Sequence, residues 1–151
     1  LQPCAPARLL RKALPRLARA AENPDLAAAF ETHLEETQGQ IERIDQVVET
    51  LGIRLKRIKC AAMEGLVEEG KEVIDSIDKG PVRDAALIGG AQKVEHYEIA
   101  SYGTIAALAK QLGYKDALPL LLETLAEEKS TDEKLTLLAK GGGNAKAAQA
   151  A

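Results

Sequence analysis

The segment FETHLEETQGQIERIDQVVETLG, residues 30–52, carries the clearest structural signal in this chain. Its apolar residues recur at alternating steps of four and three positions, which places them on one stripe of an α-helix. This spacing is typical of helices that pack into bundles. The stripe consists of Phe30, Leu34, Thr37, Ile41, Ile44, Val48 and Leu51.

Residues at both ends of this segment set its limits. Asn23 can act as an N-cap, Pro24 suits the first helical position, and Asp25 places a negative charge in the first turn. Gly52 is a favourable residue to end a helix. The sequence therefore predicts a helix that begins at Pro24 and ends near Leu51.

The same periodicity continues on both sides of this helix. We expect further helices over about 7–21, 55–77 and 81–112, and a last one that Asp116 begins. Pro15 should kink or interrupt the first of these. Since alternating strand patterns are lacking, the chain is predicted to be all-α, an up-and-down bundle with helix 55–77 in the connection between its neighbours. Its expected core contains Phe30, Leu34, Ile41, Val94, Ile105, Leu121 and Leu125.

The composition agrees with one helical domain over residues 1–140, followed by a flexible tail over 141–151. The chain of 151 residues is 46% hydrophobic and 28% charged, so disorder is disfavoured. Its net charge is −3 and its acidic and basic residues alternate, which disfavours nucleic-acid binding. Apolar runs are too short to span a membrane.

Cys4 and Cys60 form no Cys-x-x-Cys motif, and with no visible secretory signal this favours a cytoplasmic protein. We expect Cys60 to be a small buried residue.

Polar residues interrupt the apolar stripes at one level. Glu98 lies in the stripe of helix 81–112 with Glu95 on the same side, and Glu128 and Asp132 interrupt the stripe of the last helix. His33 borders the stripe of helix 24–51. Inward carboxylates at three- and four-residue spacing are how bundles hold metal ions, and with one imidazole they suit iron or manganese and accept zinc. In the alternative interpretation these groups flank the seam with their charges in water, and no metal binds.

Four segments resemble one known protein family over residues 13–139. They are HLEETQGQIERIDQVVE, KCAAMEGLVEEGKEVI, RDAALIGGAQKVEHYEIASYGT and ETLAEEKSTDEKLT, and they are similar to the YciE/YciF family of bacterial ferritin-like stress proteins. The resemblance implies a ferritin-like four-helix bundle with an additional helix in the crossover connection. It also implies a homodimer and a role in osmotic and general stress.

The wider superfamily includes rubrerythrin-like di-iron proteins, and the resemblance extends to their ligands. Glu95 and Glu98 correspond to the paired glutamates of the penultimate bundle helix, and Glu128 and Asp132 to a Glu-x-x-x-His motif with Asp in place of His. The Glu-x-x-His motif of helix 24–51 falls either on residues 35 and 38 or on residues 37 and 40, and periodicity favours the second register. Ala7 stands where relatives carry a helix-1 glutamate. A di-metal site would therefore be incomplete.

These observations lead to one main expectation and two alternatives. We expect a stress-response protein with a weak or degenerate metal site formed by Glu98, Glu128, Asp132, Glu95 and His33. The first alternative is a rubrerythrin-like di-iron oxidoreductase or peroxidase. The second is a structural dimer that binds no metal. The sequence identifies no small-molecule substrate.

Overall fold

The chain folds into a bundle in which all regular structure of the described residues is helical. The computed structural model describes residues 4–55 and 59–151, with side chains from Ala7 onward. The helices are α1 (Cys4–Ala20), α2 (Pro24–Leu51), α3 (Ala61–Ser76), α4 (Pro81–Gln111), α5 (Ala117–Leu138) and, after a π-helical turn (Ala139–Gly143), α6 (Asn144–Ala150). None of these helices is long and apolar enough to cross a membrane.

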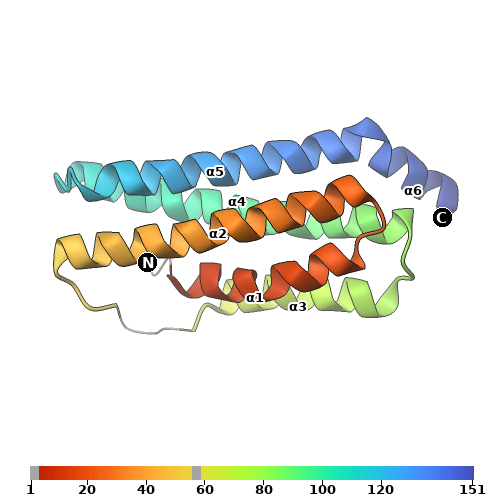
Figure 1. The fold of residues 1–151 in the computed structure, drawn as a ribbon, viewed down its shortest axis with the longest axis horizontal. Helices are drawn as coiled ribbons and strands as arrows, with labels where there is room; N and C mark the ends of the chain where they lie inside the picture. The colour runs from red at the N-terminus through yellow and green to blue at the C-terminus, as the bar shows by residue number, and fades with distance from the viewer. Residues whose placement is uncertain (1–3, 56–58) are drawn as a thin grey trace.

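Helices α2, α4 and α5 form the long rods of the bundle, and α1 and α3 lie along one side of it (Figure 1). Helix α2 packs against α1 and α5, and α5 packs against α4. Helix α3 packs against both α1 and α4 and returns the chain along the bundle, so that α2 and α4 run in the same direction (Figure 1). The predicted four-helix bundle, with an additional helix in its crossover connection, is confirmed.

The limits of α2 are those that its capping residues predict. The Asn23 side chain accepts a hydrogen bond of 2.8 Å from the backbone N–H of Asp25. At the other end Gly52 has φ 62°, and the N–H groups of Gly52 and Ile53 donate to the carbonyls of Glu49 and Val48. This left-handed termination favours glycine because it has no Cβ.

The turn between α1 and α2 is fixed to α4 by a buried carboxylate. Asp84 is 6% exposed, and its two oxygens accept hydrogen bonds of 2.8 Å from the backbone N–H groups of Glu22 and Asn23. A buried charge needs such partners. Asp84 therefore has a structural role and holds the α1–α2 turn against the start of α4.

Two expectations about the first half of the chain need correction. Of the kink or interruption expected at Pro15, the interruption is wrong: α1 is continuous from Cys4 to Ala20, and the buried residues Leu14 and Ala18 hold it in the bundle on both sides of the proline. Helix α3 begins at Ala61, six residues later than expected. Cys60, directly before it, has extended backbone with φ −96° and ψ 90°, so the helix does not continue toward its N-terminal side.

The frayed tail expected after residue 140 is largely helical instead. Gly142 has φ 122°, and at Gly143 a Cβ atom would lie 2.9 Å from the carbonyl oxygen of Leu138. Glycines at these two positions therefore allow the chain to bend sharply after α5. The bend brings α6 against α4 (Figure 1).

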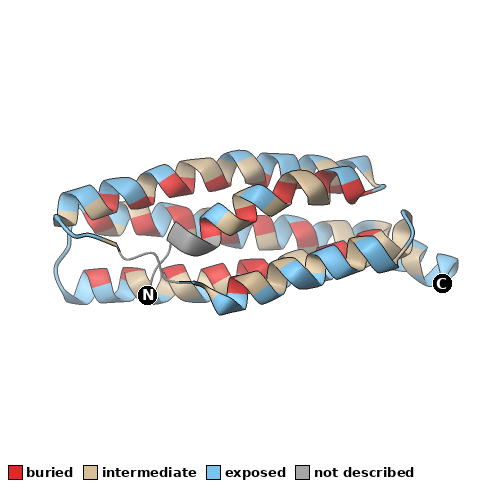
Figure 2. Cartoon of the chain, turned by 90° about the horizontal axis from the view of Figure 1, so that it is seen from below, coloured by how far each residue is buried: buried red, intermediate tan, exposed pale blue. Residues whose placement is uncertain are grey.

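Buried residues face the interior of the bundle along every long helix (Figure 2), but they form two apolar clusters, where one core was expected. One cluster includes Leu14, Phe30 and Leu87, and the other includes Ile44 and Leu121. Of the seven residues predicted for the core, Phe30, Ile41, Val94 and Leu121 are buried, whereas Leu34, Ile105 and Leu125 are half-buried.

Along the second half of α4 the buried face differs from the stripe that the sequence predicts for this helix, which continues from Val94 through Ser101, Ile105 and Leu108 to Leu112. Tyr102, Ala106 and Ala109 are buried, whereas Leu108 and Leu112 are 47% and 62% exposed. Small alanines allow α4 and α5 to approach closely. The large leucines of this segment are therefore left on the outer surface.

Candidate metal centre

Four buried side chains from three helices meet at one level of the bundle. His33 comes from α2, Glu95 and Glu98 from α4, and Glu128 from α5, and each is at most 2% exposed. One nitrogen or carboxylate oxygen from each lies within 4.8 Å of the corresponding atoms of the other three. Glu95 and Glu98 can act together because residues three apart lie on the same side of a helix.

The imidazole of His33 is oriented by a carboxylate outside this group. Its Nδ1 lies 3.3 Å from Oε2 of Glu36, which also accepts a hydrogen bond of 3.2 Å from the Thr131 hydroxyl. We assign the proton to Nδ1, so that the lone pair of Nε2 faces Glu95 and Glu128, at 3.3 Å and 3.9 Å from their nearest oxygens. A carboxylate that accepts from the second ring nitrogen is the usual support of a metal-binding histidine.

The carboxyl groups of the cluster are hard to ionise together. Burial raises the pKa of Glu95 well above its ordinary value, and the neighbouring Glu128 raises it further. Burial is also the main reason that the pKa of Glu98 is raised well above the ordinary value, with Glu128 again contributing. The pKa of Glu128 is raised by burial and partly offset by contacts with Glu95 and His33. A bound cation would remove the cost of ionising these groups.

The donor atoms fit a metal ion. Buried polar atoms in proteins almost always have hydrogen-bond partners. In this cluster the atoms without one are His33 Nε2, Glu95 Oε2, both carboxylate oxygens of Glu98 and both of Glu128. Hard oxygens with one imidazole suit iron or manganese and also accept zinc. Four residues are enough to hold one ion and leave coordination positions for water.

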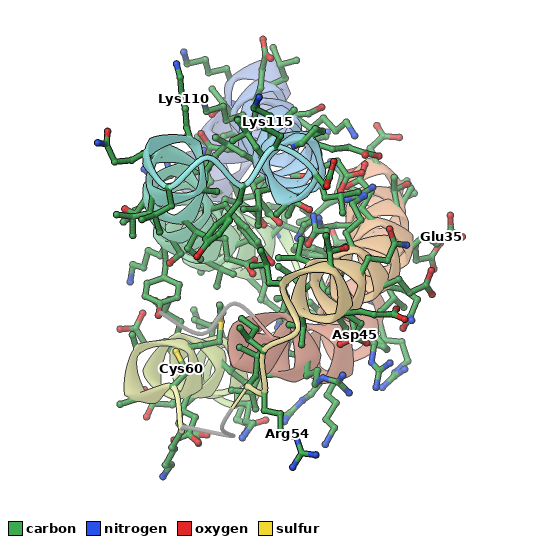
Figure 3. All side chains as sticks on the ribbon, turned by 90° about the vertical axis from the view of Figure 1, so that its left-hand side faces the viewer. Glu35, Asp45, Arg54, Cys60, Lys110 and Lys115 are labelled. Carbon is green, nitrogen blue, oxygen red and sulfur yellow. The ribbon has the colours of Figure 1, made fainter. Side chains whose placement is uncertain are left out.

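The ligand set is smaller than that of a complete di-metal bundle. Ala7 of α1 is fully buried and has no donor atom. Of the two registers considered for α2, Thr37 and Gln40 are the buried pair, whereas Glu35 points away from the bundle (Figure 3). The Thr37 hydroxyl donates to the carbonyl of His33 at 2.7 Å. Gln40 donates to a carboxylate on α5 and keeps its buried Oε1 without a partner.

Asp132 lies beside the cluster, although it was expected to converge with Glu98 and Glu128. The buried face of α5 passes through Thr124, Glu128 and Thr131, so a step of four from Glu128 turns Asp132 toward the edge. Its side chain is 23% exposed. Its Oδ1 accepts a hydrogen bond of 3.1 Å from Gln92 and lies 3.3 Å from Nε2 of the exposed His96.

Two supporting residues were missed in the sequence. Glu36 and Thr131 both contact Nδ1 of His33, and the hydrogen bond to His33 is the main reason that the pKa of Glu36 is lowered. The spacing of three between His33 and Glu36 could have indicated the first contact. The Thr131 contact depends on how α2 and α5 pack, and no local sequence pattern predicts it.

The thiol of Cys60 is less buried than expected. Cys60 precedes α3, is half-buried, and its Sγ lies 3.1 Å from the hydroxyl of Tyr97 on α4. It is a free cysteine. Cys60 thus contacts a polar group and is not a purely apolar residue of the core.

Comparisons with known proteins agree with this architecture. Protein YciF of Escherichia coli (strain K12) is 65% identical over 139 residues, which are 91% of this chain and 84% of that protein. The crystal structure of the E. coli stress protein YciF matches with a TM-score of 0.90 at 62% identity, over 94% of this chain and 89% of the other. YcfI, a candidate structural protein from Rhodopseudomonas palustris, matches with a TM-score of 0.83 at 44% identity, over 87% and 83% of the two chains. The model of a family described as a domain of unknown function, DUF892, matches residues 7–148. The resemblance to YciF seen in the sequence is thereby confirmed, and the chain belongs to the DUF892 family.

Proposed function

We propose that this chain is a ferritin-like, cytoplasmic stress-response protein that holds one iron or manganese ion on His33, Glu95, Glu98 and Glu128. The observation that carries the proposal is the cluster of three buried carboxyl groups and one imidazole whose donor atoms lack partners and lie within 4.8 Å of one another. Without a cation this arrangement is costly, because buried like charges repel and cannot be hydrated.

The charges of the cluster support a cation of charge two or three. Three ionised glutamates contribute −3, and a histidine that binds a cation through the lone pair of Nε2 adds no charge. A divalent ion would leave a charge of −1 and a trivalent ion would leave none. Such partial or full compensation is what makes a buried anionic site tolerable.

Metal analysis of the purified protein tests this proposal. Protein prepared without chelator should contain about one iron or manganese ion per chain. Glu98→Gln and Glu128→Gln keep the side-chain shape and should reduce the bound metal strongly. The matched control is Glu35→Gln, since Glu35 is exposed on the outside of α2. Equal metal content in the wild type and in Glu98→Gln would refute the proposal.

A rubrerythrin-like oxidoreductase or peroxidase is the first alternative. Two-metal sites hold ions about 3.5–4 Å apart, and di-iron bundles use about six side chains, a Glu from each of two helices and a Glu-x-x-His pair from each of the other two. Ala7 supplies none from α1. This alternative predicts two metal ions per chain and consumption of hydrogen peroxide by the iron-loaded protein, with both lost in Glu98→Gln.

A homodimer is compatible with either function. Leu108 of α4 and Leu112, which directly follows its last residue, are exposed and four positions apart, so they offer an apolar surface to a second copy. If the dimer is a structural module without metal, its assembly should be the same with and without chelator, and the purified protein should contain no stoichiometric metal. Sedimentation velocity together with metal analysis separates these cases.

A further inference from the structure

A large cavity lies between α1, α3 and α4 and ends at the candidate metal centre. Its volume is about 560 Å³. This lies within the range of about 300–1,000 Å³ typical of ligand pockets. The cavity extends along α1 from Leu9 to Leu17, and eight residues of helix span about 12 Å. His33 and Glu95 line its inner end.

The depth of this cavity is lined mainly by apolar side chains, and most of the charged residues lie at its rim. Leu10, Leu14, Phe30, Leu87 and Leu135 line its depth and are all buried. Apolar walls of this kind bind hydrocarbon and offer few partners to polar molecules.

Small residues on α4 provide the room. Gly90 lines the cavity, and a Cβ atom built on it meets nothing within 4 Å. Glycine in the middle of a helix costs about 0.5–1 kcal/mol relative to alanine. The helix therefore retains a destabilising residue at a position where a side chain would reduce the cavity.

The charged residues along the cavity favour an anionic group at its rim. Four cations, Lys12, Arg16, Lys71 and Lys93, line it, against one rim carboxylate, Glu69. Arg16, Lys71 and Lys93 each pair with a carboxylate of α3. Lys12 of α1 is exposed and has no ion-pair partner within the described part of the chain.

Electrostatics also sets the direction in which such a ligand would enter. An anionic head at the inner end would leave water beside Glu95 and the other buried carboxyl groups, which offer it no positive charge. At the rim the same head meets Lys12, and its hydrocarbon tail follows the apolar walls inward. A molecule with one negative charge and a linear hydrocarbon tail therefore fits this cavity, with the charge at the cationic rim and the tail against the apolar walls.

We propose that this cavity binds a fatty acid of medium chain length, with the alkyl chain between α1, α3 and α4 and the carboxylate at Lys12. This site is distinct from the metal centre, although the two are adjacent at His33 and Glu95. Binding does not require the metal, because the carboxylate is placed at the exposed Lys12 of the rim and not at His33 or Glu95.

Titration calorimetry with dodecanoic acid, below its micelle concentration and in the presence of chelator, tests the proposal on the full chain. We expect saturable binding of one molecule per chain. Gly90→Leu should weaken binding at least tenfold by filling the cavity, and Ala13→Leu should do the same from the α1 wall. The matched control is Gly103→Leu, on the same helix but outside the cavity, at a position where a Cβ also meets nothing within 4 Å.

The role of the charge is tested separately. Dodecanol should bind several-fold more weakly than dodecanoic acid, and Lys12→Gln should remove most of this difference. Glu98→Gln should bind the fatty acid as the wild type does, so failure of the metal proposal would leave this one intact. No saturable binding would overturn the proposal. So would unchanged affinity in the folded Gly90→Leu and Ala13→Leu variants, or binding that disappears when metal is removed.

Discussion

Replacing Glu98 by glutamine should change how the stability of the metal-free protein depends on pH. Glu98 is 1% exposed and neither of its oxygens has a hydrogen-bond partner, and burial raises its pKa well above the ordinary value of 4.5. In the unfolded chain the same group ionises near its ordinary pKa. As pH rises above 4.5, the unfolded state loses this proton while the folded state keeps it, so the fold becomes less stable.

The size of the effect follows from proton linkage. Each group that stays protonated only in the folded state lowers the free energy of unfolding by about 1.4 kcal/mol per pH unit. For Glu98 this amounts to at most about 2.7 kcal/mol between pH 5 and pH 7. For a domain of this size the melting temperature changes by about 2–4 °C per kcal/mol. The difference in melting temperature between Glu98→Gln and wild type should therefore shift in favour of the variant by up to ~5–10 °C between pH 5 and pH 7.

The assay is thermal and urea denaturation in chelator across pH 5 to 7.5, with Glu35→Gln as the exposed control. Adding iron or manganese should reverse the order at neutral pH, because wild type gains binding free energy and the variant gains little. At a metal concentration one thousand times the dissociation constant, that gain is about 4.1 kcal/mol, which exceeds the largest effect of the Glu98 carboxyl group. If the free energies of unfolding of wild type and Glu98→Gln depend on pH in the same way in chelator, the pKa of Glu98 is not raised in the folded protein, and this prediction is refuted.

Three further changes test other parts of the molecule. Glu36→Gln should weaken metal binding about 10- to 100-fold without unfolding the protein, because the His33 ring loses the carboxylate that orients it; isothermal titration with Mn²⁺ measures this. Leu121→Ala should cost about 2–5 kcal/mol in urea denaturation because Leu121 is 2% exposed, whereas Leu122→Ala, at 47% exposure, should cost much less. Leu108→Glu should shift a dimer toward monomer in sedimentation velocity, and an unchanged dimer would exclude that surface.

The parts of the fold that the sequence predicted are those governed by local chemistry. Asn23, Pro24 and Gly52 act within one turn of their own position, so they placed the ends of α2 correctly. The start of α3 was not predictable in this way, because the crossing between two helices is set by tertiary geometry. The glycines before α6 suggested a frayed end in the sequence. In the structure they form a bend instead, and this bend depends on the contact of α6 with α4, which no local pattern shows.

Periodicity predicted which helix faces form the candidate site, but it did not define the edges of those faces to a single residue. Glu98 and Glu128 are at the centre of their buried faces and converge as expected. Asp132 is one position away from the buried face of α5, and Thr131 occupies its place. A rotation of 100° per residue separates these neighbours, but a stripe drawn from a few apolar residues has an edge uncertain by about one position. Because a carboxylate is a better metal ligand than a hydroxyl, the sequence favoured Asp132, whereas Thr131 is the buried residue.

The division of the core by the polar layer also has a consequence for how the protein opens. The two apolar clusters lie on either side of His33, Glu95, Glu98 and Glu128 and share few side chains across that layer. Regions stabilised by separate contacts exchange their amide hydrogens as separate units. We therefore expect two exchange classes in the metal-free protein, one for each half of the long helices. An ion bound to α2, α4 and α5 at once would join the halves, so that amides far from the ligands slow together and the bundle opens as one unit.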